Sequence, residues 1–122
     1  MRSASNIHGK SGLGASLELY AEGKPSDKNG ADFIIEMARK YTGKLEILSL
    51  GPLTDVALAL EKSPEIAGAI ACVTVMGGGI HAGNATKYAE FNIVADPEAA
   101  SVVFSSGVKT VMIGLDATNL CY

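Results

Sequence analysis

The sequence of 122 residues contains no tryptophan and only two cysteines, Cys72 and Cys121. The two cysteines lack the CxxC spacing of a zinc or redox motif, and one pair does not make the disulfide framework of a small secreted protein. Cys72 lies within an apolar run, where a buried thiol is the usual interpretation. The cysteine content therefore favours neither a zinc or redox site nor a disulfide-stabilised secreted protein. We expect a reduced, cytoplasmic location.

Long hydrophobic runs and clusters of basic residues are also missing. The first thirty residues contain no apolar stretch typical of a signal peptide, and no stretch reaches the length of a membrane span. The net charge is −3, with acidic and basic residues interspersed, so no basic stripe could neutralise a nucleic-acid backbone. We expect no membrane and no nucleic-acid partner. A neutral ligand or a metal cation fits this charge better than a phosphorylated one.

The composition is otherwise that of an ordinary globular α/β protein. Hydrophobic residues make up 48% and charged residues 19%. This length supports one domain and is too short for two. Residues 1–14 are polar and glycine-rich and predict a loop, although a doubly wound protein usually begins with a hydrophobic strand.

Apolar spacing predicts alternating helices and strands along the chain. In chain order these are a helix near 30–42, a strand at 45–50, a helix after Pro52, a strand at 71–76, a loop at 77–95, a helix opened by Asp96 and Pro97, and a strand at 110–115. This order predicts an α/β fold with an open, mainly parallel sheet and crossover helices.

In such sheets, ligands bind beyond the carboxyl ends of the strands. The three expected strand ends are Leu50-Gly51, Met76-Gly77 and Leu115-Asp116, and each is followed by polar or glycine-rich sequence. We therefore expect the functional site at this edge.

The segment 76–92 contains most of the candidate functional residues. Gly77, Gly78 and Gly79 follow a buried strand and would let the backbone approach a ligand closely. Glu90 and Asn92 flank one residue, so an extended backbone would point both to the same side, where an acceptor and an amide suit the hydroxyls of a diol. The alternative is a loop of solvated polar residues, because the triple glycine lacks the spacing of a phosphate-binding motif.

The run VMGGGIHAGNATKYAEFNIVADPEAA, residues 75–100, resembles the signature stretch of the inosine/uridine-preferring nucleoside hydrolases. The stretches 50–54 and 111–116 agree with the same family in order, and 7–14 is similar to a family loop beside the active site. The resemblance implies a partial nucleoside-hydrolase fold, with 1–122 as a single partial domain. In the complete domain, it implies hydrolysis of the N-glycosidic bond of ribonucleosides to ribose and free base.

The resemblance also implies roles for particular residues. The Met76 backbone would lie near the ribose, and Asn84 and Glu90 would hold ribose hydroxyls, notably on the 5′ side. Asn92 would bind the lower ribose hydroxyls beside a metal. The loop containing His8 would border the nucleobase.

The metal implied by the resemblance is Ca²⁺, to which Leu50 would offer its main-chain carbonyl. A carbonyl ligand tolerates any side chain, and calcium prefers oxygen. The family's aspartate cluster, which includes the general base, and its later His-Asp pair would lie outside residues 1–122. We therefore expect no catalytic residue in this chain, doubtful calcium binding by the chain alone, and no hydrolysis by the isolated chain.

Two alternatives to an enzyme segment stay open. One is a non-catalytic remnant that binds a nucleoside or pentose, and the other is a structural piece that folds only within a larger assembly. His8 and His81 could be ordinary loop histidines, and Asp116 a helix cap or turn residue. We also expect a homo-oligomer, or a monomer with a sticky surface, because a missing first strand would leave a sheet edge or an apolar face uncovered.

Overall fold

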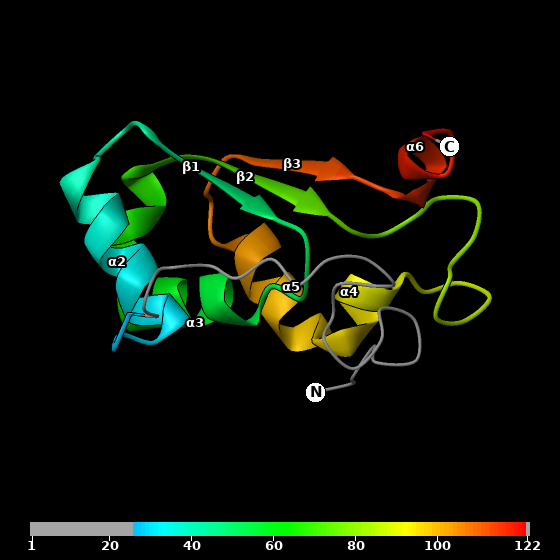
Figure 1. The fold of residues 1–122 in the computed structure, drawn as a ribbon, viewed down its shortest axis with the longest axis horizontal. Helices are drawn as coiled ribbons and strands as arrows, with labels where there is room; N and C mark the ends of the chain where they lie inside the picture. Colours follow the sequence, from blue (N-terminus) through cyan, green and yellow to red (C-terminus); the bar gives the residue numbers. More distant parts are fainter. Residues whose placement is uncertain (1–25, 122) are drawn as a thin grey trace, which may run out of the picture.

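The computed structural model describes residues 26–121, which form a three-stranded sheet with helices packed on one side (Figure 1). The strands are β1 (Leu45–Ser49), β2 (Ile70–Met76) and β3 (Thr110–Ile113). The helices are α2 (Gly30–Lys40), α3 (Thr54–Lys62), the 3-10 helix η1 (Pro64–Gly68), α4 (Phe91–Ala95), α5 (Pro97–Ser105) and α6 (Leu115–Thr118).

The sheet has the order β1-β2-β3, and both neighbouring pairs are parallel. Each connection between strands carries helices, α3 and η1 in the first and α4 and α5 in the second. The prediction of an open parallel sheet with crossover helices is confirmed. Because all three strands run the same way, their carboxyl ends meet at one edge of the sheet.

Local signals in the sequence set the limits of the longer helices. The Asn29 side chain accepts a hydrogen bond from the Asp32 N–H at 2.9 Å and so caps α2. Asp96 accepts from the Ala99 N–H at 3.1 Å, which confirms the predicted start of α5. Gly107 has φ +81°, a conformation that suits glycine, and it turns the chain from α5 toward β3.

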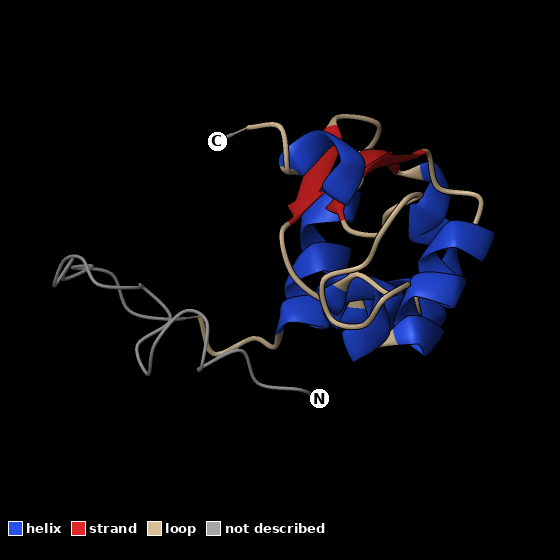
Figure 2. Cartoon of the chain, turned by 90° about the vertical axis from the view of Figure 1, so that its right-hand side faces the viewer, coloured by secondary structure: helices blue, strands red, loops and turns tan. Residues whose placement is uncertain are grey.

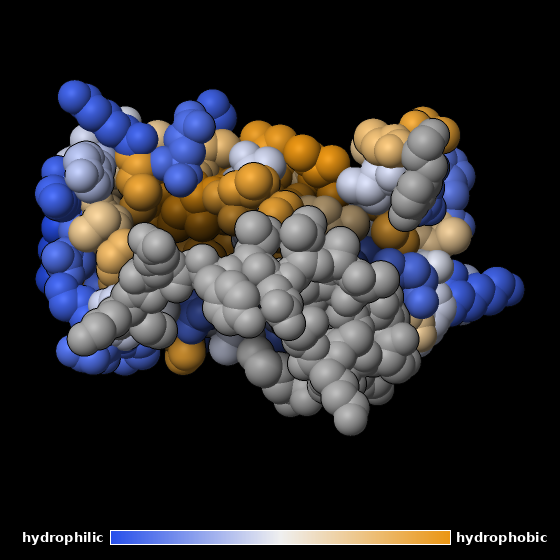
Figure 3. All heavy atoms as spheres, viewed as in Figure 1, coloured by the Kyte–Doolittle hydropathy of each residue, from blue (hydrophilic) through white to orange (hydrophobic). Residues whose placement is uncertain are grey.

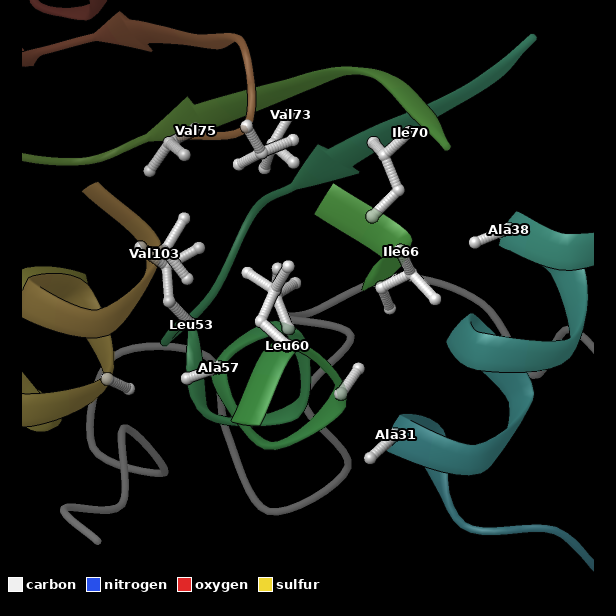
Figure 4. Packing of buried hydrophobic residues seen from close by; sticks show 14 of the residues in the cluster. Ala31, Ala38, Leu53, Ala57, Leu60, Ile66, Ile70, Val73, Val75 and Val103 are labelled. Atoms are coloured by element: carbon white, nitrogen blue, oxygen red, sulfur yellow. The ribbon is translucent and has the colours of Figure 1, made fainter. Parts of the chain in front are cut away.

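The hydrophobic core lies between β2 and the helices. Val73 and Val75 of β2 are completely buried and point toward Leu53, Leu60 and Val103 on the helical layer (Figure 4). The core extends along α2 and η1 through further buried aliphatic residues, among them Ala31, Ile35, Ala38 and Ile66. These side chains hold the sheet against α3 and α5.

The opposite face of the sheet exposes apolar side chains. Leu48 of β1 is 64% exposed, and Val111 and Ile113 of β3 are 43% and 40% exposed. Figure 3 shows hydrophobic residues at the surface along the strands, in the upper part of the view. We call Leu48, Val111 and Ile113 the open sheet face. Among the described residues, no helix is long and apolar enough to cross a membrane.

The segment 77–95 differs from the predicted loop, because its last five residues form α4. The prediction missed this helix because five residues are too few to show helical periodicity. Glu90 starts it by accepting hydrogen bonds from the N–H groups of Asn92 and Ile93. The loop therefore covers 77–90, and we call it the strand-end loop.

Candidate functional site

The strand-end loop, α4 and α6 gather at the carboxyl edge of the sheet, as Figure 1 shows, and this edge faces the viewer in Figure 2. Three polar side chains from these segments, Glu90, Asn92 and Asp116, bind backbone groups of other segments at this edge. They form the candidate site together with the ends of β1 and β2.

Asn92 joins the ends of the first two strands. Its Nδ2 donates to the Met76 carbonyl at 3.0 Å and to the Leu50 carbonyl at 3.3 Å. Since carbonyls only accept, these contacts fix the orientation of the amide and commit its two N–H groups. Within residues 26–121, the Asn92 Oδ1 accepts no hydrogen bond. The structure thus brings together three residues that the sequence singled out, Leu50, Met76 and Asn92.

Glu90 is the buried carboxylate of the site, with 3% of its surface exposed. Its Oε1 accepts from the Asn92 N–H at 2.9 Å, and its Oε2 accepts from the N–H groups of Gly78 and Ile93, both at 3.1 Å. A carboxylate has about four acceptor positions. Three are used by the backbone, so one is left for a ligand hydroxyl.

The expectation of an extended backbone at Glu90 and Asn92 is wrong. Glu90 caps α4 and Asn92 lies in its first turn, so the two side chains are not neighbours on one face of a strand. They still act at one place, because the Asn92 N–H binds the Glu90 carboxylate while the Asn92 side chain reaches the two strand ends. Helix capping brings them together, a contact that alternation along a strand cannot predict.

The glycines after β2 allow close packing of the chain on itself. A Cβ on Gly77 would lie 3.0 Å from the Ile93 side chain and 3.4 Å from Glu90 Oε2, and a Cβ on Gly79 would lie 2.5 Å from the Ala82 carbonyl oxygen. Gly78 has φ +73°. These glycines therefore serve the fold of the loop, besides any approach to a ligand.

Asn84 lies on the exposed part of the strand-end loop. Its Oδ1 accepts from the Phe91 N–H at 2.8 Å, so it binds the first residue of α4. Its Nδ2 makes no hydrogen bond within residues 26–121. As far as residues 26–121 are concerned, the two N–H groups of the Asn84 amide are therefore left without an acceptor.

Asp116 lies in α6, just after β3, and joins the strand-end loop to this helix. Its Oδ2 accepts from the Ile80 N–H at 2.7 Å, and its Oδ1 accepts from the His81 N–H at 3.2 Å and lies 2.6 Å from the His81 Nδ1. The Ile80 N–H, and then the His81 imidazole, lower the pKa of Asp116 from 3.8 to about 2. The carboxylate is ionised and only accepts, so the His81 Nδ1 carries the proton.

The role of Asp116 was missed from the sequence. A helix cap or a turn residue was the alternative given for it. In the structure, its side chain binds the backbone of Ile80 and His81, which lie 36 and 35 positions earlier in the sequence. His81 is a loop histidine with an 85% exposed side chain, as one alternative proposed. The signal available in advance was only the place of Asp116 just past a strand end. His8 lies outside the described residues.

The described residues alone do not fit a calcium ion. Within 26–121, no three His, Cys, Asp or Glu side chains come together in a way that could hold a metal. The Leu50 carbonyl has one lone pair left after it accepts from Asn92. Calcium takes six to eight oxygens, and this carbonyl would supply only one of them.

A depression of about 480 Å³ lies between α2 and α3, and it shares no residue with the strand-end site. Asn29, Asp55, Glu61 and Lys62 are among the residues that line it. Lys62 is already paired with Asp32. The charges that line this depression are of both signs and partly paired. In parallel sheets, ligands bind at the strand ends. We therefore place the candidate site at the strand ends.

The geometry agrees with a comparison of the whole sequence. The family model of the inosine-uridine preferring nucleoside hydrolases matches residues 1–122. The chain belongs to this family. The resemblance seen in the segment 75–100 is therefore confirmed over the full length of the chain.

Two curated members of the family illustrate the similarity. The pyrimidine-specific ribonucleoside hydrolase RihA of Salmonella newport (strain SL254) is 42% identical over 116 residues, which are 95% of this chain and 37% of the relative. Probable uridine nucleosidase 1 of Oryza sativa subsp. japonica is 39% identical over 123 residues, covering 99% of this chain and 38% of the relative. The chain spans little more than a third of the length of these nucleoside hydrolases.

Solved structures of nucleoside hydrolases share the fold. The plant nucleoside hydrolase PpNRh1 superposes with a TM-score of 0.89 at 34% identity, covering 97% of this chain and 37% of that one. A purine-preferring ribonucleoside hydrolase from Gardnerella vaginalis gives 0.85 at 40% identity, covering 92% and 36%. The partial nucleoside-hydrolase fold implied by the sequence is confirmed.

Proposed function

We propose that this chain supplies the ribose-holding part of a ribonucleoside hydrolase, which cleaves the N-glycosidic bond to release ribose and free base. The hydrogen bonds of Asn92 to the ends of β1 and β2 support the proposal, because they bring polar groups suited to sugar hydroxyls to the edge where parallel sheets bind ligands. The relatives are named for pyrimidine, uridine or purine preference, and all are nucleosidases or nucleoside hydrolases. Ribose is therefore the shared part of the substrate.

The hydrogen-bonding groups left over in the site suit a polyol. Glu90 has one acceptor position, Asn92 has Oδ1, and Asn84 has two donors. Sugar hydroxyls both donate and accept, so this mixture can bind neighbouring hydroxyls in a fixed geometry. Glu90 and Asn84 would hold the 5′ side and Asn92 the lower hydroxyls, with the Met76 backbone beside the ring. His8 would border the nucleobase.

The contribution of these residues to catalysis would be positioning. Burial of Glu90 at 3% exposure removes water from its carboxylate, so a hydrogen bond with a ribose hydroxyl is stronger there than at the surface. Contacts that tighten as positive charge develops on the ribosyl group lower the barrier to bond cleavage. The chain would hold the sugar in this way while other segments supply the base and acid.

We further propose that the Leu50 carbonyl is one ligand of a Ca²⁺ site completed by segments outside residues 26–121. The ion would lower the pKa of a bound water. What supports this is the location of the carbonyl at the strand end next to Asn92. We propose that the carboxylates completing this site lie outside residues 1–122, so the isolated chain should hydrolyse neither inosine nor uridine.

A non-catalytic nucleoside-binding or pentose-binding role is the second candidate. It is favoured because polar groups suited to sugar hydroxyls lie in a region without a cluster of metal ligands, as far as residues 26–121 are concerned. Such a protein would bind ribose through the same residues and release no base.

The test compares the purified 122-residue chain with the full reading frame that contains it. Both are incubated with inosine and uridine, with and without Ca²⁺, and released ribose is measured. We expect calcium-dependent release only from the full reading frame. Glu90→Gln should lower kcat/KM about 10- to 100-fold, since a hydrogen bond to a charged group contributes about 1.5–3 kcal/mol. Glu98→Gln is the control.

Release by the isolated chain that disappears in Glu90→Gln would contradict the division of labour proposed here. No release from the full reading frame would contradict the hydrolase, and nucleoside binding followed by NMR would then test the second candidate.

We propose that residues 1–122 form one partial domain that is cytoplasmic and self-associates. Cys72 and Cys121 are free thiols, which favours a reducing location. The open sheet face supports self-association, because apolar surface next to a sheet edge favours contact between chains. Static light scattering over a range of concentrations measures it. A monomer at the highest concentration would contradict self-association.

A further inference from the structure

The strand-end loop is held firmly at its two ends. At the start, the Gly77 N–H donates to the Ile113 carbonyl at 3.1 Å, and the Leu115 N–H donates to the Gly78 carbonyl at 2.9 Å. At the end, Glu90 caps α4 and binds the Gly78 N–H. Both ends are therefore fixed relative to the sheet without any help from the middle of the loop.

The part of the loop near Asn84 is a turn held together by its own backbone. The Gly83 N–H donates to the Lys87 carbonyl, and the N–H groups of Asn84, Ala85 and Thr86 all donate toward the Ala89 carbonyl. These bonds fix the shape of the turn. They do not fix its position relative to the strands, because the partners of these backbone bonds lie within the loop; toward α4, the Asn84 Oδ1 accepts from the Phe91 N–H at 2.8 Å.

Asp116 provides the missing connection at Ile80 and His81. Within the described residues, the backbone N–H groups of these two positions donate only to its carboxylate. The approach is close, since a Cβ on Gly114 would lie 3.0 Å from the Gly78 carbonyl oxygen and a Cβ on Gly79 would lie 3.5 Å from Leu115. The end of β3 and the loop thus touch through backbone and are joined by one side chain.

We propose that Asp116 is a positioning residue that holds the middle of the strand-end loop against the end of β3 and so sets where Asn84 meets the ribose. This inference rests on the proposed function. Asn84 lies only three residues beyond His81, so release of Ile80 and His81 loosens the turn on its β3 side and leaves the contact of Asn84 with the Phe91 N–H to hold it. Glu90 and Asn92 keep their places, because α4 and the strand ends hold them independently.

The roles of the two Asp116 oxygens can be separated with three variants. Asp116→Ala removes all contacts with the loop. Asp116→Asn keeps one acceptor oxygen and should behave as an intermediate, because the NH2 group that replaces the other oxygen cannot accept an N–H. His81→Ala removes the imidazole and keeps both backbone bonds, so it should have the smallest effect.

The matched control is Asp96→Ala. Asp96 is also an aspartate that accepts a backbone N–H, from Ala99, and a side-chain donor, the Thr54 hydroxyl at 2.5 Å. It contacts α3 and α5 and no residue of the strand-end loop. Its loss should weaken the start of α5 and leave the loop unchanged.

The first measurement is amide hydrogen exchange by NMR on the full chain. In Asp116→Ala we expect exchange at Ile80 and His81 to be at least about tenfold faster, with exchange in β2 and α5 unchanged, since loss of a local contact opens only the local segment. The control should show the reverse pattern. Unchanged exchange at Ile80 and His81 would overturn the proposal.

The second measurement is the KM and kcat of the full reading frame with uridine. Asp116→Ala should raise KM about tenfold with a smaller change in kcat, because it loosens a contact made with both bound substrate and transition state. Faster exchange with an unchanged KM would overturn the positioning role while leaving the hydrolase intact. Wild-type protein that neither binds nor cleaves nucleoside would contradict the proposed function, and hydrogen exchange alone would then decide whether Asp116 holds the loop.

Discussion

The core beneath the sheet and the carboxyl edge of the same sheet are stabilised in different ways. In the core, aliphatic side chains from β2, α3 and α5 exclude water, and Val73, Val75 and Val103 are completely buried. At the edge, the carboxylates of Glu90 and Asp116 bind backbone N–H groups of distant segments. The core depends on buried area, whereas the edge depends on a few directional contacts. Stability should therefore respond most to the core and site geometry most to the edge.

The largest effect is expected in the core. Leu53→Ala removes a side chain that is 1% exposed, and we expect the free energy of unfolding to fall by about 2–5 kcal/mol because of lost burial and the cavity left behind. Leu58→Ala, in α3 with 48% exposure, is the control and should change it by less than about 1 kcal/mol. Urea denaturation measures both. Equal losses would show that the core does not dominate stability.

The next effect concerns the buried carboxylate of the edge. Glu90→Ala leaves the N–H groups of Gly78, Asn92 and Ile93 without their acceptor, and we expect a loss of about 1–3 kcal/mol in the free energy of unfolding. Glu98→Ala changes an exposed glutamate in the first turn of α5 and serves as the control. If the two variants are equally stable, Glu90 is not the anchor of α4.

A change of pH should affect the edge and leave the apolar core untouched. The pKa of Asp116 is lowered from 3.8 to about 2, so its contacts stabilise the fold fully above pH 3.8 and are lost as the pH falls toward 2. The amide NMR signals of Ile80 and His81 should follow this titration with a midpoint near 2. In Asp116→Asn they should not titrate. A midpoint near 3.8 in the wild type would mean that the loop does not stabilise the carboxylate.

The smallest effect is expected on the open sheet face. Val111→Thr replaces a 43% exposed side chain by one of equal shape, and the free energy of unfolding should change by less than about 0.5 kcal/mol. Val103→Thr makes the same change in the core, where a buried hydroxyl costs about 1–3 kcal/mol. Thermal denaturation compares them. The comparison uses protein dilute enough to be monomeric, and equal costs there would show that the open sheet face is covered within a single chain.

The prediction from sequence succeeded where the signal was periodic or local. The buried strand before Gly77 and the start of α5 at Asp96 and Pro97 were both predicted, because apolar runs and helix caps act over a few neighbouring residues. It failed at α6, because the strand predicted at 110–115 ends at Ile113 and Leu115 begins this helix, and at α4, and consequently in the expected geometry of Glu90 and Asn92. A five-residue helix has too little periodicity to be recognised. Its cap, the Glu90 carboxylate, also accepts from the Gly78 N–H, a contact that forms only after the loop has folded.

The sequence by itself determined the parallel α/β arrangement, the membership of the nucleoside hydrolase family and the residues on which a ribose site would draw. Hydrophobic pattern and motif spacing are properties of neighbouring residues, so they can be read along the chain. Only the tertiary structure decided which hydrogen-bonding groups of these residues are already paired. The Asn92 amide donates to the Leu50 and Met76 carbonyls, the Glu90 carboxylate accepts three backbone N–H groups, and Asp116 accepts from the N–H groups of Ile80 and His81. The physical reason is that a hydrogen bond depends on the distance and angle between two atoms. For residues as far apart in the sequence as Leu50 and Asn92, 42 positions, this distance and angle are determined only when the chain folds.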